Sequence, residues 1–284
     1  MLFGVRDYTF MENHLQEFTF NNIHIRHAID CKPDDSTCEM HIHTRCEIFY
    51  FVSGRVEYLV EGSEYPLERG SVMIMRPAEA HRPKILADKL YERYTINFPL
   101  SAADSIDPER IFMKPFLDRP LGTGNLYLSS EFDGISIEKC FKQICSCNDK
   151  YTAAVKIQLF LMSILDAIRT AHISRNGSEC PVEQTRAMHI LKYINEHLYE
   201  KISVSMLAEH FYISTSQFNR IFRNATGSSP WEYITLKRLT AAKEKISSGT
   251  HITKACEECG FDDYSVFYRA YVKYFGRSPK QDNN

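Results

Sequence analysis

Residues 214–230, STSQFNRIFRNATGSSP, and residues 263–279, DYSVFYRAYVKYFGRSP, repeat one short pattern 49 positions apart. The residues that keep their spacing in the first copy are Ser216, Phe218, Arg220, Gly227, Ser229 and Pro230. They recur in the second copy as Ser265, Phe267, Arg269, Gly276, Ser278 and Pro279. A pattern repeated at fixed internal spacing predicts a duplicated supersecondary unit.

Each copy reads as two short helices joined by a tight turn. In the first copy the irregular stretch 211–213 ends one helix, and Ser214 stands three residues before Gln217, which is the signature of a capped helix start. In the second copy a turn at Gly260 precedes Asp263, which opens the next helix. This arrangement predicts a helix-turn-helix in each copy.

The second helix of each copy has an apolar side and a polar side. Phe218 and Phe222 share one side of the first copy, as Phe267 and Tyr271 do in the second. Arginine pairs with guanine and asparagine with adenine in the major groove, so the opposite sides are candidate DNA-reading faces. They present Ser216, Asn219, Arg220 and Arg223 in the first copy, and Ser265, Tyr268, Arg269 and Val272 in the second.

The segment between the copies sets their separation. Residues 231–246 contain no proline or glycine, and their apolar residues follow helical spacing. A helix of this length spans about 24 Å, which with the half-widths of the flanking units places the recognition helices about 34 Å apart, one turn of B-DNA. We therefore predict that both helices enter successive major grooves from one side.

A simpler alternative for the outward arginines is a solvated surface, or an ion pair with Asp262 or Asp263, but the repetition of the pattern argues against it. Charge is a weaker guide. Residues 181–284 hold 14 Lys and Arg against 11 Asp and Glu, a balance of +3, and residues 1–180 hold 20 against 25, a balance of −5. A nucleic-acid partner is expected for the C-terminal part, with modest, salt-sensitive non-specific affinity.

From Glu183 to its end the chain resembles the DNA-binding domain of the AraC/XylS family of bacterial transcription regulators. The motifs that carry the resemblance are Tyr233, Arg238, Leu239 and Ala242 in the linker, and Gly260-Phe261, Ser265, Phe267, Arg269, Phe275-Gly276 and Ser278-Pro279 in the second unit. The resemblance implies base reading by Ser216, Asn219 and Arg220 and, less uniformly, by Tyr264, Ser265 and Arg269. The chain departs from the family at Cys256, usually alanine, and at Lys280-Gln281, commonly Tyr-Arg.

The N-terminal half has a different pattern, with short β-rich runs broken by glycine, proline and charge. Residues 47–52 and 56–60 are separated by Ser53-Gly54-Arg55, and residues 72–75 and 94–98 continue the series. Many short strands at regular spacing predict a small barrel or sandwich.

Four polar residues within this half resemble the motifs of cupin barrels, which AraC-type regulators with sensory domains commonly carry. The resemblance covers residues 18–99 and rests on His41, His43, Glu47, Gly54, Gly70, Pro77 and His81. In metal cupins three imidazoles and a carboxylate hold a divalent metal, and His41, His43, Glu47 and His81 supply that set. Against metal, Arg82-Pro83-Lys84 follow His81 where the family has an asparagine.

The same four residues have two other uses. Regulatory cupins often keep such histidines as hydrogen-bonding groups of an effector pocket, and a cavity in a barrel mouth is the default small-molecule site. The residues can also be structural. We expect an effector pocket and no cofactor, with a divalent metal as the alternative.

The region between barrel and DNA-binding domain reads as two helices, at residues 135–150 and 153–173. A broad apolar stripe on the second predicts packing on the barrel, a dimer interface, or both. It consists of Ile157, Phe160, Leu161, Ile164, Leu165 and Ile168. The polar stretch 174–179 before Pro181 is the predicted hinge.

Composition excludes other classes. No targeting segment is visible, and the longest apolar stretch, 159–165, is far too short to span a bilayer. Nine cysteines at irregular spacing indicate reduced thiols of a cytoplasmic protein. Cys256 with Cys259, and Cys145 with Cys147, are better explained as packing residues of helices than as metal or redox pairs.

The sequence thus predicts a multi-domain α+β protein: a cupin-like effector-binding domain at residues 1–133, a helical dimerisation and linker region at 134–180, and an all-α domain with two helix-turn-helix units at 181–284. The predicted function is a regulator that binds double-stranded DNA and is not an enzyme. The resemblance implies activation, RNA polymerase as a partner, a homodimer and a small-molecule effector such as a carbohydrate. The alternatives are a metal-dependent cupin enzyme with a DNA-binding tail and a constitutive regulator with an inert barrel.

Overall fold

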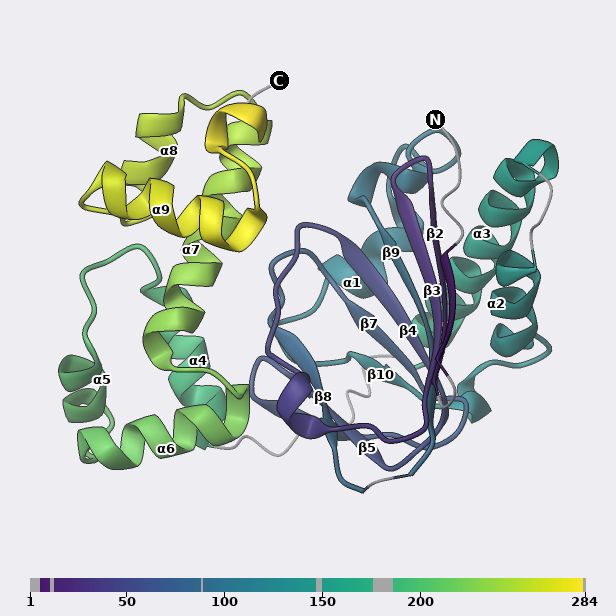
Figure 1. The fold of residues 1–284 in the computed structure, drawn as a ribbon, viewed down its shortest axis with the longest axis horizontal. Helices are drawn as coiled ribbons and strands as arrows, with labels where there is room; N and C mark the ends of the chain where they lie inside the picture. The colour runs from purple at the N-terminus through teal and green to yellow at the C-terminus, as the bar shows by residue number, and fades with distance from the viewer. Residues whose placement is uncertain (1–5, 11–12, 88, 147–149, 176–185, 283–284) are drawn as a thin grey trace.

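The computed structural model describes residues 6–10, 13–87, 89–146, 150–175 and 186–282. Figure 1 shows a β-rich part flanked on one side by two helices and on the other by an all-helical part. This architecture confirms the predicted α+β class, with the β-rich part first along the chain and the helical part last.

The described strands form two antiparallel sheets. The larger sheet has the order β1-β2-β3-β9-β4-β7-β10, and the smaller has the order β6-β5-β8. The strand bounds are β1 Arg6–Phe10, β2 Asn13–Phe20, β3 Ile23–Asp30, β4 Cys46–Ser53, β5 Val56–Val60, β6 Ser63–Pro66, β7 Val72–Met75, β8 His81–Ile85, β9 Tyr91–Phe98 and β10 Leu126–Tyr127. The predicted runs at 47–52, 56–60, 72–75 and 94–98 are confirmed as β4, β5, β7 and β9, whereas β1 to β3 were not predicted.

The two faces of the larger sheet have different roles. On β9, Tyr94, Ile96 and Phe98 are buried in the cluster that packs against helices. Because side chains alternate along a strand, Arg93 and Asn97 face the other sheet and the space between the two. The larger sheet is therefore the wall between a hydrophobic core and an internal cleft.

Two helices cover the outer face of this sheet (Figure 1). They are α2 Ile137–Cys145 and α3 Lys150–Ser174, so the helix predicted at 135–150 is shorter than expected. Ser136 caps α2 by accepting a hydrogen bond from Lys139 N at 3.3 Å, which fixes its start. Of the predicted stripe, the residues buried in one cluster with the sheet are Ile157, Leu161, Ile164, Leu165 and Ile168, and Phe160 packs against that cluster. Packing on the barrel is therefore confirmed, and the dimer interface stays a prediction.

The helical part contains the two predicted units, joined by one long helix. Its helices are α4 Arg186–Glu196, α5 Val204–His210, α6 Thr215–Thr226, α7 Pro230–Ser247, α8 Ile252–Glu258 and α9 Tyr264–Phe275. Ser214 and Asp263 cap α6 and α9, accepting hydrogen bonds from Gln217 N at 3.2 Å and Val266 N at 2.9 Å. Ser229 and Glu232 form a reciprocal capping box at the start of α7. Figure 1 shows α7 running between the α4–α6 part and the α8–α9 part.

The remaining elements are a short helix and several 3₁₀ turns. They are α1 Lys114–Leu117, η1 Asp35–Thr37, η2 Leu100–Ala103, η3 Ile111–Met113, η4 Ser129–Glu131 and η5 Pro279–Asp282. Of the predicted hinge 174–179, Ser174 ends α3, and residues 176–179 lie outside the described part.

The cysteines support the packing interpretation. Cys256 and Cys259 are 2% and 0% exposed in the core of the second unit, and Cys145 is buried against α3. Cys147 lies outside the described residues. Among the described helices, none combines the length and apolarity that crossing a bilayer requires.

Candidate functional site

The first predicted reading face lies on α6 and points away from the domain core. Phe218 and Phe222 anchor the helix, at 0% and 1% exposure. The exposed residues of the face are Ser216, Arg220 and Arg223. Asn219 is half-buried, and its Nδ2 donates a hydrogen bond to Thr215 O at 2.9 Å, so this amide must leave its own helix to reach a base.

The second face lies on α9 and is built in the same way. Phe267 and Tyr271 are fully buried and hold the helix on the core. The exposed residues are Tyr264, Ser265, Tyr268 and Arg269. The structure thus places the predicted DNA-reading residues on two helix surfaces, with Val272 half-buried on α9, and their contacts with bases stay a prediction.

The alternative of an ion pair for the outward arginines is not realised within the described residues. Asp262 pairs with Lys201 at 3.4 Å, and Asp263 caps α9. Arg220 and Arg269 make no ion pair in the same part of the chain. Both guanidinium groups therefore keep their donors available for a partner.

One buried arginine fixes the two units relative to each other. Arg238 of α7 donates from Nε to Leu198 O at 2.7 Å and from Nη2 to Glu200 O at 2.7 Å, both in the first unit. Its Nη1 donates to Gly260 O, in the turn of the second unit, at 2.6 Å. A side chain that satisfies carbonyls of both units limits how far one can rotate against the other.

The four residues predicted from the cupin motifs lie together at the cleft: Glu47 and His81 are buried, His43 is half-buried and His41 is exposed. Their ligand atoms all lie within 4.8 Å of one another, from His41, His43, Glu47 and His81. His43 Nε2 lies 3.1 Å from Glu47 Oε2, and His81 Nε2 lies 3.7 Å from the same oxygen. His41 pairs with His81 across an isolated β-bridge, with ring centroids 4.3 Å apart.

A backbone carbonyl orients each imidazole. The Nδ1 atoms of His41, His43 and His81 lie 3.2, 2.9 and 2.7 Å from the carbonyl oxygens of Glu39, Arg45 and Glu79. An Nδ1–H that donates to a carbonyl leaves Nε2 free to face the cluster.

Burial and neighbouring charge shift the pKa values of His41 and His81 in opposite directions. Burial lowers the pKa of His41 to about 4, and His81 adds to the effect. Burial also opposes protonation of His81, but the Glu47 carboxylate outweighs it and raises the pKa of His81. Burial works to raise the pKa of Glu47, yet the neighbouring His43 and His81 imidazoles hold it well below its usual range. At neutral pH a neutral His41 therefore faces an ionised Glu47.

The residues present fit a divalent metal in donor set and orientation. Three imidazole nitrogens and one carboxylate oxygen suit first-row divalent ions, and the carbonyls on Nδ1 select the tautomer that ligates. His81 Nε2 is buried and has no hydrogen-bond partner. His41, His43, Glu47 and His81 would hold the ion, which would supply a Lewis acid.

The cluster borders a larger cleft that sequence reasoning did not resolve. The cleft has a volume of about 800 Å³, within the range of small-molecule sites. The residues on its walls that were not predicted include Arg26, Tyr91 and Asn97. Strand alternation was the available signal: in β3 and β9 the apolar residues alternate with these polar ones, so they had to face the opposite side.

Two segments beside the cluster also contact the first helix-turn-helix unit. Ile42 and Ala80 belong to the buried cluster formed with α4, α5, α6 and α7. Their sequence neighbours His41, His43 and His81 form the histidine cluster. Alternate residues of the same segments therefore serve the cluster and the contact between domains.

A buried ion pair fastens this contact. Lys237 of α7 pairs with Glu61 at the β5–β6 turn, and their side chains are 4% and 2% exposed. Tyr233 donates its hydroxyl to Glu61, and Ala80 N donates to Glu61 Oε1 at 2.7 Å. Lys237 Nζ also donates to Ala78 O at 2.7 Å. We name this set, Glu61, Lys237, Tyr233, Ala78 and Ala80, the docking lock.

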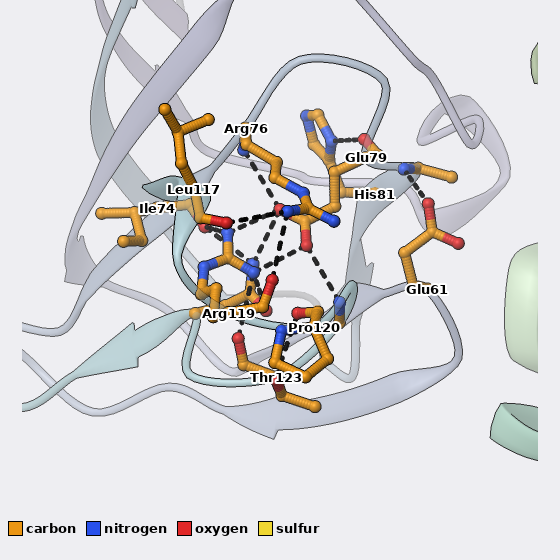
Figure 2. A network of polar contacts seen from close by, with 12 residues as sticks. Glu61, Ile74, Arg76, Glu79, His81, Leu117, Arg119, Pro120 and Thr123 are labelled. Carbon is orange, nitrogen blue, oxygen red and sulfur yellow. Dashed lines mark hydrogen bonds and ion pairs between the residues drawn. The ribbon is translucent and has the colours of Figure 1, made fainter. Parts of the chain in front are cut away.

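A second buried ion pair supports the segment between the lock and the cluster. Arg119 holds Glu79 through two hydrogen bonds of 2.7 Å, and Gly122 N donates to the same carboxylate at 2.9 Å (Figure 2). Glu79 O in turn lies 2.7 Å from His81 Nδ1, and the residue between them donates its N–H to Glu61. Residues 79–81 therefore join the histidine cluster to the docking lock through one rigid network.

Comparison with known proteins identifies both parts. A family model described as a helix-turn-helix domain matches residues 207–284, and one described as a cupin domain matches residues 29–91. The chain is 34% identical over 102 residues to the probable transcriptional regulator LumQ of Photobacterium leiognathi, covering 36% of this chain and 41% of that relative. It is 22% identical over 269 residues to the HTH-type transcriptional activator RhaS of Yersinia pseudotuberculosis, covering 89% of this chain and 92% of that relative. The structure of ToxT from Vibrio cholerae O395 aligns at 11% identity and a TM-score of 0.40, over 92% of this chain and 97% of that one.

The chain thus spans less than half the length of one of these relatives and nearly the whole of the other. A cupin barrel followed by two helix-turn-helix units on one connecting helix defines a class of DNA-binding transcription regulators. The two matched domains and their order along the chain are those that the resemblance to AraC/XylS regulators implies.

Proposed function

We propose that this protein reads specific DNA with α6 and α9, and that a small molecule in the barrel cleft controls its occupancy of that DNA. The observation that carries the proposal is the double use of residues 41–43 and 79–81. One set of side chains in these segments forms the histidine cluster, and the alternate set packs on the DNA-binding domain. A ligand that displaces the histidine-cluster side chains therefore also displaces the residues that pack on the DNA-binding domain.

The base-reading role rests on exposure and on available donors. Arg220 and Arg269 are the principal readers, because each is exposed and makes no ion pair within the described residues. The residues that assist them are Ser216, Asn219 and Arg223 on α6, and Tyr264, Ser265 and Tyr268 on α9. Arginine on guanine is the commonest specific contact in the major groove.

Control by the ligand requires a preference between two arrangements. A ligand shifts an equilibrium only by its differential affinity for the two states. The docked arrangement seen here is one state, and release of the docking lock gives the other. We assign the cleft as the site where that preference is set.

Assembly and partners complete the proposal. The domains are residues 1–133, 134–180 and 181–284, and the second forms a homodimer through α3. Apolar side chains on the outward side of α3 support this, since Val155, Leu159 and Ile173 are 67%, 57% and 52% exposed. Activation through RNA polymerase is proposed because a relative that spans the chain is named a transcriptional activator. No catalysis is part of the proposal.

A gel-shift titration of the full chain against its own upstream intergenic DNA tests the proposal, at physiological salt with competitor DNA. Each titration is repeated with the low-molecular-weight fraction of a cell extract and with that fraction after depletion on the purified protein. Specific binding that the fraction changes, and the depleted fraction does not, is the expected result. Specific binding that no fraction changes favours a constitutive regulator with an inert barrel. The absence of specific DNA binding contradicts the reading assignment.

A metal-dependent cupin enzyme is the second candidate, and the grouping of three imidazoles and one carboxylate, with ligand atoms within 4.8 Å of one another, favours it. Elemental analysis of purified protein tests it. About one divalent ion per chain, lost in a His43→Ala variant but kept in His14→Ala, supports a metal centre. Metal-free protein that still binds and responds on DNA contradicts it.

A further inference from the structure

The cleft floor is built from three neighbouring strands whose inward side chains form rows. In one row His24 of β3 stands opposite Asn97 of β9, which stands opposite Glu47 of β4. In the next row Arg26 stands opposite Thr95 in the same way. All five residues line the cleft. The floor therefore carries hydrogen-bonding groups in consecutive rows, as recognition of several polar groups on one ligand requires.

Three buried polar atoms on these walls have no hydrogen-bond partner. They are Arg26 Nε, Tyr91 Oη and Asn97 Oδ1. Tyr91 is 1% exposed, so its hydroxyl is withheld from bulk solvent. Buried polar groups in folded proteins are nearly always paired, and an unpaired group in a cleft marks a position that a ligand or bound water completes. Here two donors and one acceptor line the same cleft, at different positions along β3 and β9.

The charged groups of the cleft are mostly engaged with one another, but Arg26 is not. Arg93 pairs with Asp30 at 2.5 Å, and Glu47 is held by His43 and His81. Within the described residues Arg26 makes no ion pair and no side-chain hydrogen bond. Burial, followed by the nearby Arg93 cation, lowers the pKa of Arg26 from its ordinary value, against the opposing effect of the Glu17 and Asp30 carboxylates. An anion bound there would relieve both effects.

The remaining walls suit a ligand with an apolar face as well as hydroxyl groups. Phe49, which continues the Arg26–Thr95 row on β4, and Tyr58 of β5 line the cleft with ring centroids 4.8 Å apart. Aromatic rings give large contact area to a flat C–H surface. A ligand with hydroxyl groups on its edges, a C–H face and one anionic group matches all three parts of the wall.

We propose that the cleft binds a polyhydroxylated organic anion, a sugar acid or sugar phosphate, with its carboxylate or phosphate on Arg26. Arg93 flanks the anionic group, and Tyr91 and Asn97 bond its hydroxyl groups. This inference rests on the proposed function, because the bound anion is the effector that controls DNA occupancy. A sugar acid and a sugar phosphate share one anionic group on a polyol. They differ in the shape and charge of that group.

Calorimetric titration of the full chain with matched probes tests the proposal. Glucuronate and galacturonate carry the carboxylate, glucose 6-phosphate and galactose 6-phosphate carry the phosphate, and glucose, galactose and the methyl ester of glucuronate are uncharged. We expect a charged member of a series to bind at least about tenfold more tightly than its uncharged match, the size of one charge-assisted hydrogen bond. Tighter binding of the uronates identifies a sugar acid, and tighter binding of the phosphates identifies a sugar phosphate.

Variants locate the anion. Arg26→Gln removes the preference for the charged probe, whereas Arg55→Gln, at an exposed arginine of the same barrel outside the cleft, keeps it. Tyr91→Phe weakens charged and uncharged probes alike, because it removes a hydroxyl contact and not the charge. The circular dichroism of each variant confirms that the barrel is folded.

Three results overturn the inference: an uncharged probe that binds as tightly as its charged match, a preference that survives in Arg26→Gln, or no charged probe bound at 10 mM, roughly the weak end of small-ligand affinity. The gel shift with the extract fraction is scored separately. If DNA binding responds to the neutral fraction of the extract but not to its anion-exchange eluate, the inference of an anionic effector is contradicted and the proposed function stands. No response to any fraction sinks the proposed function itself.

Discussion

The two helix-turn-helix units share one sequence pattern but have different surroundings. The buried cluster of the first unit includes Ile42 and Ala80 of the barrel. The cluster of the second unit contains only residues of α7, α8, α9 and their turns, among the residues described. The same fold is thus used once as a docked unit and once as a free-standing one. The comparison teaches that, in the proposed function, the barrel would act on DNA reading through the first unit.

The largest expected effect comes from breaking the docking lock. In Lys237→Ala the buried Glu61 carboxylate loses its cation, which costs about 3 to 5 kcal/mol of docking free energy. The loss of docking is measured by limited proteolysis between residues 176 and 185 and by urea unfolding of the full chain. We expect faster cleavage and separate transitions for barrel and DNA-binding domain. Lys254→Ala, at an exposed lysine of α8, is the control, and equal behaviour of the two variants contradicts the lock.

A smaller effect is expected from removing the two principal readers. Arg220→Ala and Arg269→Ala should each weaken specific DNA binding by about 1 to 3 kcal/mol and relax base preference at one position of the site. Quantitative footprinting measures both half-sites in one experiment. If docking acts on the first unit, the effector changes protection at the Arg220 half-site more than at the Arg269 half-site. Unchanged affinity in both variants removes the base-reading assignment.

Alanine substitution of the glycines that end α6 and α9 gives a matched pair of variants with a smaller expected loss of stability. Gly227 and Gly276 have φ of 74° and 66°, so alanine at either costs roughly 1 kcal/mol of backbone strain. A Cβ at Gly276 meets no atom within 4 Å, whereas at Gly227 it lies 3.0 Å from Nη1 of Arg82 in the barrel. Gly227→Ala should therefore be the more destabilising in urea unfolding. Equal losses would show that the barrel does not press on α6.

The smallest expected effect is a chemical one in the second unit. Burial raises the pKa of Cys256 and of Cys259 to about 11, so at pH 8 roughly one thiol in a thousand is ionised. Iodoacetamide should leave both unmodified in the native chain and modify both in denaturant, as followed by mass spectrometry. Rapid native modification would mean that the free-standing unit opens on its own, which would widen the contrast with the docked one.

Much of this molecule could be predicted from local pattern. The positions of Ser214 and Asp263 predict the starts of α6 and α9, because a cap acts within one helical turn. The four polar cupin residues converge as their motif indicates. The length of α2 was overestimated, because the predicted range 135–150 ran past Cys145 through a polar stretch to Lys150, where α3 begins.

What could not be predicted depends on distant partners. Lys237 and Glu61 are 176 residues apart and are charged types that normally lie on the surface, so nothing local marks them as buried. Arg26 and Asn97 enter the cleft only because β3 pairs with β9, and that pairing is set by the whole sheet. The reading faces were accessible to sequence reasoning, whereas the cleft and the lock needed the fold.

The connecting helix has a mechanical consequence. The barrel holds α7 near Lys237, and α7 continues to Ser247 before the second unit begins. Ten residues of helix give a lever arm of about 15 Å, so a 10° tilt at the point of attachment moves the far end by roughly 3 Å. That displacement approaches the rise of one base pair. A small rotation at the barrel can therefore shift the second unit out of register with its groove while the chain keeps every helix intact.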